Sequence, residues 1–222
     1  MPSRRWVQLN RKKNPNSLFI TFEGGDGAGK STLIEELNKE LQNKGHPVLK
    51  TRAPGGTAAG QLIRAILLNG GEMPLAARCE LFLYLADRAQ HVETVIQPAL
   101  QGGQIVLCDR YNDSTIAYQG VGRGFGVGTV ENLCAFATND LKPDLTIYLD
   151  VDPRIGMNRL QHQRNGKDRI EAEDIHFHEK IRAAFLEIAH HEPSRVHVID
   201  ASKSREEVLA QARSLIDVRL AR

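Results

Sequence analysis

A glycine-rich segment near the N-terminus carries the clearest chemical signal in the sequence. Residues 22–31 read FEGGDGAGKS and match the pattern Gly24-x-x-x-x-Gly29-Lys30-Ser31. In such a loop the glycines let successive backbone N–H groups turn toward a phosphate, the lysine reaches the outer phosphates, and the serine offers its hydroxyl to Mg²⁺. The pattern therefore predicts a phosphate-binding loop that works with magnesium.

The segments on either side of this loop support the same interpretation. Leu18–Phe22 (LFITF) is an apolar run typical of a buried strand, and Ser31–Asn43 has the apolar periodicity of an amphipathic helix. The start of a helix favours an anion, because its first N–H groups are unpaired and its dipole is positive there. The alternative is a glycine-rich turn that binds nothing. Such a turn would not require a strand before it and a helix after it, so these flanking segments favour phosphate binding.

Short apolar runs alternate with longer amphipathic stretches along the rest of the chain, as in parallel sheets covered on both faces. Strands are expected at Leu18–Phe22, Val48–Thr51, Ile105–Cys108, Leu145–Leu149 and Val196–Ile199. Helices are expected at Ser31–Asn43, Ala58–Asn69, Leu75–Leu100, Gly128–Thr138, Pro153–Gln163, Asp174–His190 and Ser204–Arg222. The alternation predicts an α/β fold: a doubly wound five-stranded parallel sheet flanked by helices, in a single domain over residues 18–222.

Charged residues follow the predicted strands, whose carboxyl ends form one edge of a parallel sheet. Asp109 ends the strand IVLCD and is a candidate magnesium ligand; the alternative is a carboxylate that caps an ordinary turn. Arg52 and Arg110 lie just beyond strand ends, and arginine binds phosphate through paired hydrogen bonds. A second phosphate site beside the first would suit an acceptor that is itself a phosphate ester. Surface ion pairs are the alternative for both arginines.

Two further segments are candidates for substrate contact. Arg159–Arg169 (RLQHQRNGKDR) is basic and contains an Asn-Gly turn signal, so it could close over ATP as a lid, with Arg159 or Arg164 neutralising charge during transfer. The alternative is a solvated basic loop. Tyr84 and Arg88 are four residues apart on one helix face and could bind a base, although a core tyrosine beside a paired arginine is the more ordinary interpretation.

The composition limits the possible partners. The 222 residues carry a net charge of +2, which argues against nucleic-acid and membrane partners, and no apolar run has the length of a membrane span. Cys79, Cys108 and Cys134 lack metal-ligand spacing and lie in apolar segments. They are expected to be reduced core thiols of a cytoplasmic protein.

The first seventeen residues differ from the rest of the chain. MPSRRWVQLNRKKNPNS contains five basic residues and no acid, and it lacks the apolar segment of a secretory signal. We expect residues 1–17 to be a flexible basic tail outside the fold. An organelle transit peptide is the alternative.

Several longer blocks resemble the thymidylate kinase family of bacterial type, from Leu18 to the C-terminal helix. They are FITFEGGDGAGKST, TRAPGGT, LFLYLADRAQHVETVIQPAL, VLCDRYNDSTIAYQGVGRG, PDLTIYLDVDP and KDRIEAEDIHFHEKI. The block DRYNDSTIAYQG is far more specific than the phosphate-binding loop. The resemblance implies transfer of a phosphoryl group from ATP to dTMP with Mg²⁺, in dTTP synthesis, and a homodimer packed through long helices such as Leu75–Leu100.

The resemblance also implies a role for each matching residue. The loop residues that would hold ATP are Gly24, Gly25, Asp26, Gly27, Ala28, Gly29, Lys30, Ser31 and Thr32. Those that would take part in catalysis are Lys30, Asp26, Asp109, Arg159 and Arg164, with Ser31 and Asp109 at the metal. Those that would bind dTMP are Asp26 at the sugar hydroxyl, Arg52 and Arg110 at the phosphate, Tyr84 and Arg88 at the base, Thr115 and Gln119 at its Watson–Crick edge, and Tyr118 under the deoxyribose.

Two positions depart from the family pattern. Ala53 stands where TREPGG has a glutamate, which removes one carboxylate near the acceptor phosphate. Gly27 stands where one branch of the family has an arginine in the loop, so the lid arginines Arg159, Arg164 and Arg169 fit the other branch. Two alternatives stay open: a kinase for another nucleotide or nucleoside on the same fold, and a non-kinase ATPase with the same phosphate loop.

Overall fold

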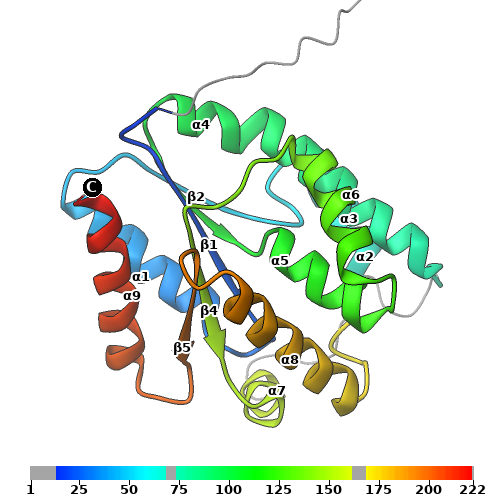
Figure 1. Cartoon of the computed structure of the whole chain (residues 1–222). Helices are drawn as coiled ribbons and strands as arrows, with labels where there is room; N and C mark the ends of the chain where they lie inside the picture. The colour runs from blue at the N-terminus through cyan, green and yellow to red at the C-terminus, as the bar shows by residue number, and fades with distance from the viewer. Residues whose placement is uncertain (1–13, 69–73, 162–168, 222) are drawn as a thin grey trace, which may run out of the picture.

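The computed structural model describes residues 14–68, 74–161 and 169–221, built around one twisted sheet (Figure 1). All five strands are parallel, in the order β2-β3-β1-β4-β5. The strands are β1 (Leu18–Gly24), β2 (Val48–Arg52), β3 (Ile105–Asp109), β4 (Leu145–Asp150) and β5 (Val196–Asp200). The predicted fold is confirmed. Strand β1 lies in the centre of the sheet, and ligands of such sheets bind at the carboxyl ends of the central strands.

Helices cover both faces of the sheet (Figure 1). They are α1 (Lys30–Asn43), α2 (Ala58–Leu68), α3 (Ala77–His91), α4 (Gln97–Gln101), α5 (Asn112–Thr115), α6 (Val127–Thr138), α7 (Pro153–Gln161), α8 (Ile175–His191) and α9 (Arg205–Leu220), with π-helical segments η1 (Val92–Ile96) and η2 (Ile116–Gly122). Helices α1 and α9 pack on one face, against Leu18, Ile20 and Phe22 of β1. On the opposite face Phe19 meets the ring of Tyr111, with centroids 5.0 Å apart.

The single long helix expected over Leu75–Leu100 is interrupted in the structure. Helix α3 passes into η1 at Val92 and then into α4. Pro98 has no N–H to donate back along the helix, and the Thr94 hydroxyl hydrogen-bonds the Gln90 carbonyl at 2.7 Å. Both effects disturb the regular backbone ladder, which explains the wider π turn at this point.

The helical segment α5–η2 was not expected from the sequence. Its residues Ile116–Gly120 are all buried, polar Gln119 included, so no solvent-exposed face marks the helical period. The expectation for the cysteines was wrong at one position: Cys79 is exposed on α3, whereas Cys108 and Cys134 are buried.

The boundary of the tail also differs from the expected one. Residues 14–17 form a turn, in which Ser17 donates to the Asn14 carbonyl at 2.7 Å and Asn14 N donates to the Leu100 carbonyl at 3.3 Å. Across the described ranges, no helix combines the length and the apolar character needed to cross a membrane.

Candidate active site

The phosphate-binding loop joins β1 to α1 in the predicted way. Gly29, with a φ of 94°, caps the start of α1 in the left-handed region that favours glycine. Lys30 lies in the first turn of the helix, and its Nζ donates to the carbonyl oxygens of Gly24 and Gly25, both at 2.9 Å. The buried ammonium group is thereby held across the mouth of the loop.

A polar pocket opens above this loop. It is lined by the loop residues Lys30 and Ser31 together with Arg52, Arg110 and Asp109. With Arg64, four cationic side chains line the pocket against the two carboxylates Asp26 and Asp109, so the pocket favours phosphate groups. The structure therefore brings together residues that follow β1, β2 and β3, as the sequence predicted.

The donor set in this pocket fits a magnesium ion. Ser31 Oγ lies 3.5 Å from Asp109 Oδ2, and Asp109 Oδ1 is buried without a hydrogen-bond partner among the described residues. No cluster of three metal-binding side chains occurs in the same ranges. One hydroxyl and one carboxylate are what Mg²⁺ needs from a protein when phosphates and water complete its octahedral shell.

Asp26 and Arg110 form an ion pair at the edge of the loop, with 2.6 Å between Asp26 Oδ1 and the Arg110 guanidinium. Burial alone would raise the pKa of Asp26, but the charges of Arg110 and Lys30 outweigh it and hold that pKa below its usual value. Arg110 has a φ of 67°, rare for a side chain with a Cβ. This unusual conformation turns the guanidinium toward the loop.

A buried carboxylate, Glu23, supports the Arg110 turn from below. It accepts hydrogen bonds from Tyr111 N at 2.6 Å and from the Ser114 hydroxyl, which in turn accepts from Arg110 at 3.2 Å. Burial, with the charge of Asp113 adding to it, raises the pKa of Glu23 to about 7. Glu23 thus connects the end of β1 to the arginine that follows β3.

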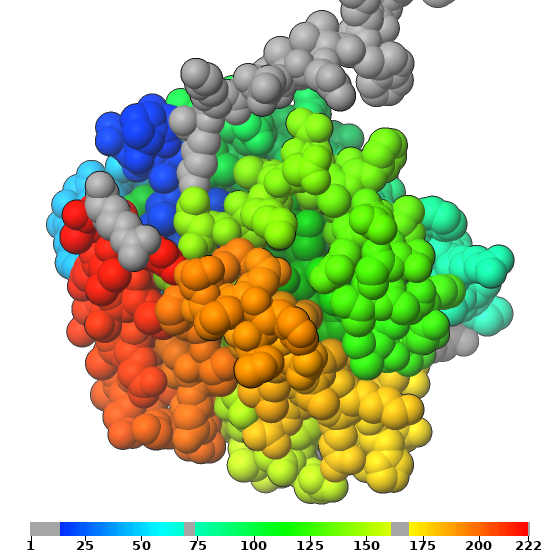
Figure 2. Space-filling view, viewed as in Figure 1, coloured from blue at the N-terminus to red at the C-terminus, as the bar shows by residue number. Residues whose placement is uncertain are grey.

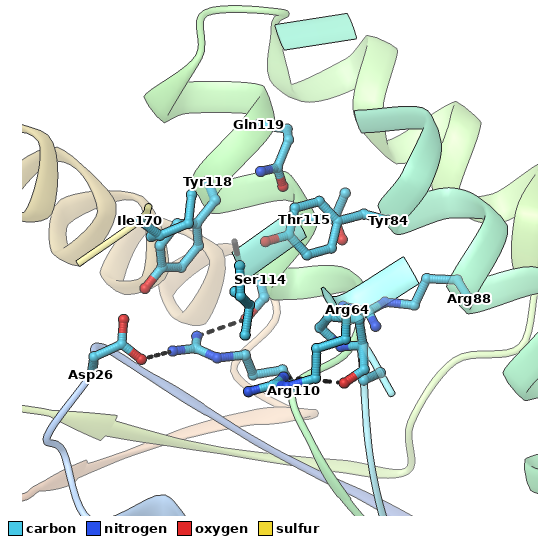
Figure 3. A pocket seen from close by; sticks show the side chains of 13 residues that line it. Asp26, Arg64, Tyr84, Arg88, Arg110, Ser114, Thr115, Tyr118, Gln119 and Ile170 are labelled. Atoms are coloured by element: carbon cyan, nitrogen blue, oxygen red, sulfur yellow. Dashed lines mark hydrogen bonds and ion pairs between the residues drawn. The ribbon is translucent and has the colours of Figure 1, made fainter. Parts of the chain in front are cut away.

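A second pocket adjoins the first, and its lining combines aromatic, amide, hydroxyl, apolar and charged side chains (Figure 3). Tyr84 and Arg88 of α3 form one side, and Thr115, Tyr118 and Gln119 of the α5–η2 segment form the other. The pockets share lining residues, which are Asp26, Ala53, Arg64 and Arg110. The Asp26–Arg110 pair therefore stands between them.

The base-binding candidates are held firmly in this second pocket. Arg88 is buried, donates to the Tyr111 carbonyl at 3.0 Å, and has an Nε without a partner among the described residues. Burial, together with the charge of Glu80, raises the pKa of Tyr84 to about 12, so its hydroxyl stays protonated. Both residues line a cavity, and Arg88 is also paired with the neighbouring Asp87 at 3.3 Å, so a role in binding a base stays a prediction.

The structure describes only residues 159–161 and 169 of the predicted lid. Arg159, on α7, donates to the Ala201 carbonyl at 3.1 and 3.2 Å and to the Gly27 carbonyl at 3.4 Å. It lines a third pocket with Lys203 and Arg205, beside the first turns of α1. Arg164 lies outside the described residues.

Several residues of the site were not singled out in the sequence. Arg64 lines both main pockets from α2, where no motif marks it. Glu23 and Ser114 lie within recognisable blocks, but only the fold shows that they meet. Glu80, which accepts from Gln119 at 2.8 Å, had one available signal: it lies four residues before Tyr84 on the same helix.

Comparisons with known proteins identify the relatives of this chain. The family model described as thymidylate kinase matches residues 22–212. Thymidylate kinase of Protochlamydia amoebophila is 48% identical over 206 residues, covering 90% of this chain and 92% of the relative. That of Desulfovibrio desulfuricans is 47% identical over 211 residues, covering 92% and 97%.

A solved structure extends this similarity to the fold. The crystal structure of thymidylate kinase from Ehrlichia chaffeensis matches with a TM-score of 0.74 and 33% identity, covering 91% of this chain and 99% of that one. The family model and the curated relatives span nearly the whole sheet and its helices. The chain belongs to the thymidylate kinase family.

Proposed function

We propose that this protein transfers the γ-phosphoryl group of ATP to dTMP, giving ADP and dTDP. The observation that carries the proposal is the pair of adjoining pockets that meet at Asp26 and Arg110. One lies above the phosphate loop, and the other contains Tyr84, Tyr118 and Gln119 in its lining. Two substrates seated in these pockets would present their phosphates to each other. Family membership supplies the identity of the substrates.

Positioning and charge neutralisation account for the catalysis. The phosphate of dTMP is already an anionic nucleophile, so a direct in-line transfer needs no strong general base. Arg110, with Arg52 and Arg64 lining the same pocket, would hold the acceptor phosphate. Lys30 would leave the loop carbonyls to neutralise the outer phosphates of ATP.

Ser31 and Asp109 are the residues that would hold Mg²⁺. The ion supplies charge neutralisation of the triphosphate when bound. Asp26, kept ionised by Arg110 and Lys30, would accept a hydrogen bond from the sugar 3′-hydroxyl of the acceptor. The remaining loop amides from Gly24 to Thr32 would hold the phosphates of the donor.

The second pocket suits a thymine base. Tyr84 supplies a ring for stacking, the unpaired Arg88 Nε supplies a donor for a carbonyl, and Gln119 supplies an amide for the Watson–Crick edge. Tyr118, with Arg110 lying 5.3 Å from its ring centroid, is placed to pack under the deoxyribose. The third pocket, beside Arg159, would accommodate the base of ATP.

An acceptor panel tests the proposal directly. ADP release should be measured with dTMP, dUMP, dGMP, UMP and AMP as acceptors, and with ATP alone. We expect dTMP to give the highest kcat/KM, about tenfold or more above dUMP, because one methyl group in an apolar site is worth about 1–3 kcal/mol. Equal kcat/KM for dTMP and AMP, or ATP turnover without an acceptor, would overturn the proposal.

We further propose a homodimer formed through the layer of α2, α3 and α6. Leu62 on α2, Phe82 on α3 and Phe136 on α6 are exposed large apolar side chains, with Phe136 at 89%. Figure 2 shows α6 on the molecular surface beside α8. Phe82→Glu should shift the mass measured by light scattering from dimer to monomer. A monomeric wild type at the same concentration would contradict the proposal.

A cytoplasmic location is proposed as well. It rests on the three free cysteines, which form no disulfide in the structure. Fractionation of cells that express the full chain, followed by an activity assay, would test it.

A further inference from the structure

Behind the base pocket lies a buried carboxylate that touches no proposed substrate. Glu80 is fully buried on α3 and lies one helical turn before Tyr84. Its Oε1 accepts from Gln119 Nε2 at 2.8 Å and from Arg123 Nε at 3.2 Å. Its Oε2 accepts from a second Arg123 nitrogen at 3.3 Å and from Arg169. The carboxylate thus receives four hydrogen bonds, about as many as its lone pairs allow.

These contacts fix which way the Gln119 amide faces. An ionised carboxylate can only accept hydrogen bonds, so the amide must turn its nitrogen toward Glu80. Gln119 is buried, and in Figure 3 its amide oxygen points into the pocket. The side chain therefore offers an acceptor to whatever base lies there, and its second N–H remains available beside that acceptor.

We propose that Glu80 is a positioning residue that sets base specificity by holding Gln119 with its oxygen toward the acceptor base. This inference rests on the proposed function. The N3 of thymine or uracil bears a hydrogen, which this oxygen accepts, and the O4 beside it accepts the remaining amide N–H. The N3 of cytosine is an acceptor and its 4-amino group is a donor, so cytosine presents the reverse pattern. A site with this polarity rejects dCMP, because the Gln119 oxygen would face another acceptor, N3, and its N–H would face another donor, the 4-amino group.

The substitution Glu80→Gln should reverse this polarity. Oε2 faces two charged donors, from Arg123 and Arg169, whereas Oε1 faces one charged donor and the neutral amide of Gln119. The oxygen of a glutamine at position 80 would therefore take the Oε2 place, and its nitrogen would face Gln119. Gln119 must then turn its own oxygen toward position 80 and present its nitrogen to the base.

Glu173 provides a matched control. Its carboxylate accepts from Nη1 of Arg123 at 2.6 Å, whereas Nε and Nη2 of that arginine donate to Glu80. Glu173→Gln removes a carboxylate from the same ion-pair network without changing the partner of the Gln119 amide. A second control is the acceptor dUMP, which has the same N3–H and O4 as dTMP.

The experiment compares the full-length wild type with Glu80→Gln and Glu173→Gln. It measures kcat/KM by ADP release, and affinity by calorimetry, for dTMP, dUMP and dCMP. We expect the dTMP/dCMP ratio to fall at least about tenfold in Glu80→Gln, the loss of one well-placed hydrogen bond. The dTMP/dUMP ratio should stay within about twofold, and Glu173→Gln should keep both ratios.

Two results would overturn the inference. One is a folded Glu80→Gln protein with the wild-type dTMP/dCMP ratio; the other is an equal loss for all three acceptors, which would assign Glu80 a purely structural role. If Glu80→Gln does not fold, Glu80→Asp provides the test. Its carboxylate keeps the charge but lies farther from Gln119, and the dTMP/dCMP ratio must fall in that variant. A wild type that does not phosphorylate dTMP would refute the proposed function instead, and the calorimetric ratio would still test Glu80.

Discussion

Gly27 and Gly156 lie so close together that neither can bear a side chain. A Cβ on Gly27 would lie 2.0 Å from the carbonyl oxygen of Gly156, and a Cβ on Gly156 would lie 2.4 Å from the carbonyl oxygen of Asp26. Gly27 also has a φ of 75°, which favours glycine. Helix α7 therefore packs directly against the phosphate loop. An arginine at position 27 would not fit, because its Cβ would overlap the backbone of Gly156.

The first prediction concerns that contact. Gly156→Ala should lower the free energy of unfolding by about 1–3 kcal/mol, since a backbone must move to admit the methyl group, and should lower kcat because the loop moves with it. In a helix interior the same change is normally stabilising. Gly128→Ala in α6, where nothing lies within 4 Å of the added Cβ, is the control and should be neutral or slightly stabilising. Chemical denaturation of both variants measures the difference; equal stabilities would contradict it.

The second prediction concerns Lys30. Lys30→Ala should lower kcat by about a hundredfold or more, because it removes a preorganised charge from the site of transfer. The exposed Lys39, on the same helix, provides the control, since Lys39→Ala removes an equal charge outside the pocket. Circular dichroism should show that both variants are folded. Near-native turnover in folded Lys30→Ala would exclude the assigned role.

The sequence was sufficient to predict the sheet and the strand–loop–helix arrangement around the phosphate loop, for identifiable reasons. Most strands are short, largely apolar runs, and the loop residues are adjacent in the chain, so local patterns define both. The assignment of Tyr84 and Arg88 to base binding depended on the family resemblance, because their spacing alone favours core residues. The fold then shows both in one pocket with Gln119.

The parts that were missed depend on contacts between distant segments. Glu23 and Ser114 are hydrogen-bonded although 91 positions separate them in the sequence, and Glu80 and Arg169 although 89 do. No local sequence pattern predicts either contact. The buried α5–η2 helix has no solvent-exposed face to give it a helical period, and the π turn at η1 follows from the combined effect of Pro98 and Thr94. In each case the information lies in tertiary packing and not in a periodic signal.

The third prediction uses the raised pKa of Glu23. The folded state binds this proton more tightly than the unfolded chain, because burial and the charge of Asp113 raise the pKa from 4.5 to about 7. The resulting stabilisation is fully present below pH 4.5 and is lost as the pH rises through about 7. Relative to Glu23→Gln, the wild type should therefore lose stability over this window, by on the order of 3 kcal/mol. Urea unfolding across the pH range measures this; parallel profiles for the two proteins would show that Glu23 does not titrate there.

The fourth prediction concerns the cation that completes the site during transfer. Gly27 cannot supply it, because its contact with Gly156 leaves no room for a side chain. We expect Arg159 or Arg164 to do so, and alanine at the responsible position should lower kcat by about a hundredfold or more. The KM for ATP should change less, since this interaction strengthens in the transition state.

Single and paired alanine variants at these two positions distinguish the possibilities. Arg159 already touches the loop through the Gly27 carbonyl and also lines the pocket beside Lys203 and Arg205. If Arg159→Ala raises the KM for ATP while kcat is kept, Arg159 binds the donor base and Arg164 is left as the transition-state cation. If even the double variant keeps the native kcat, neither arginine acts in the transition state, and Lys30 with the acceptor-side arginines must neutralise the developing charge. Steady-state kinetics with saturating dTMP and varied ATP separate these outcomes.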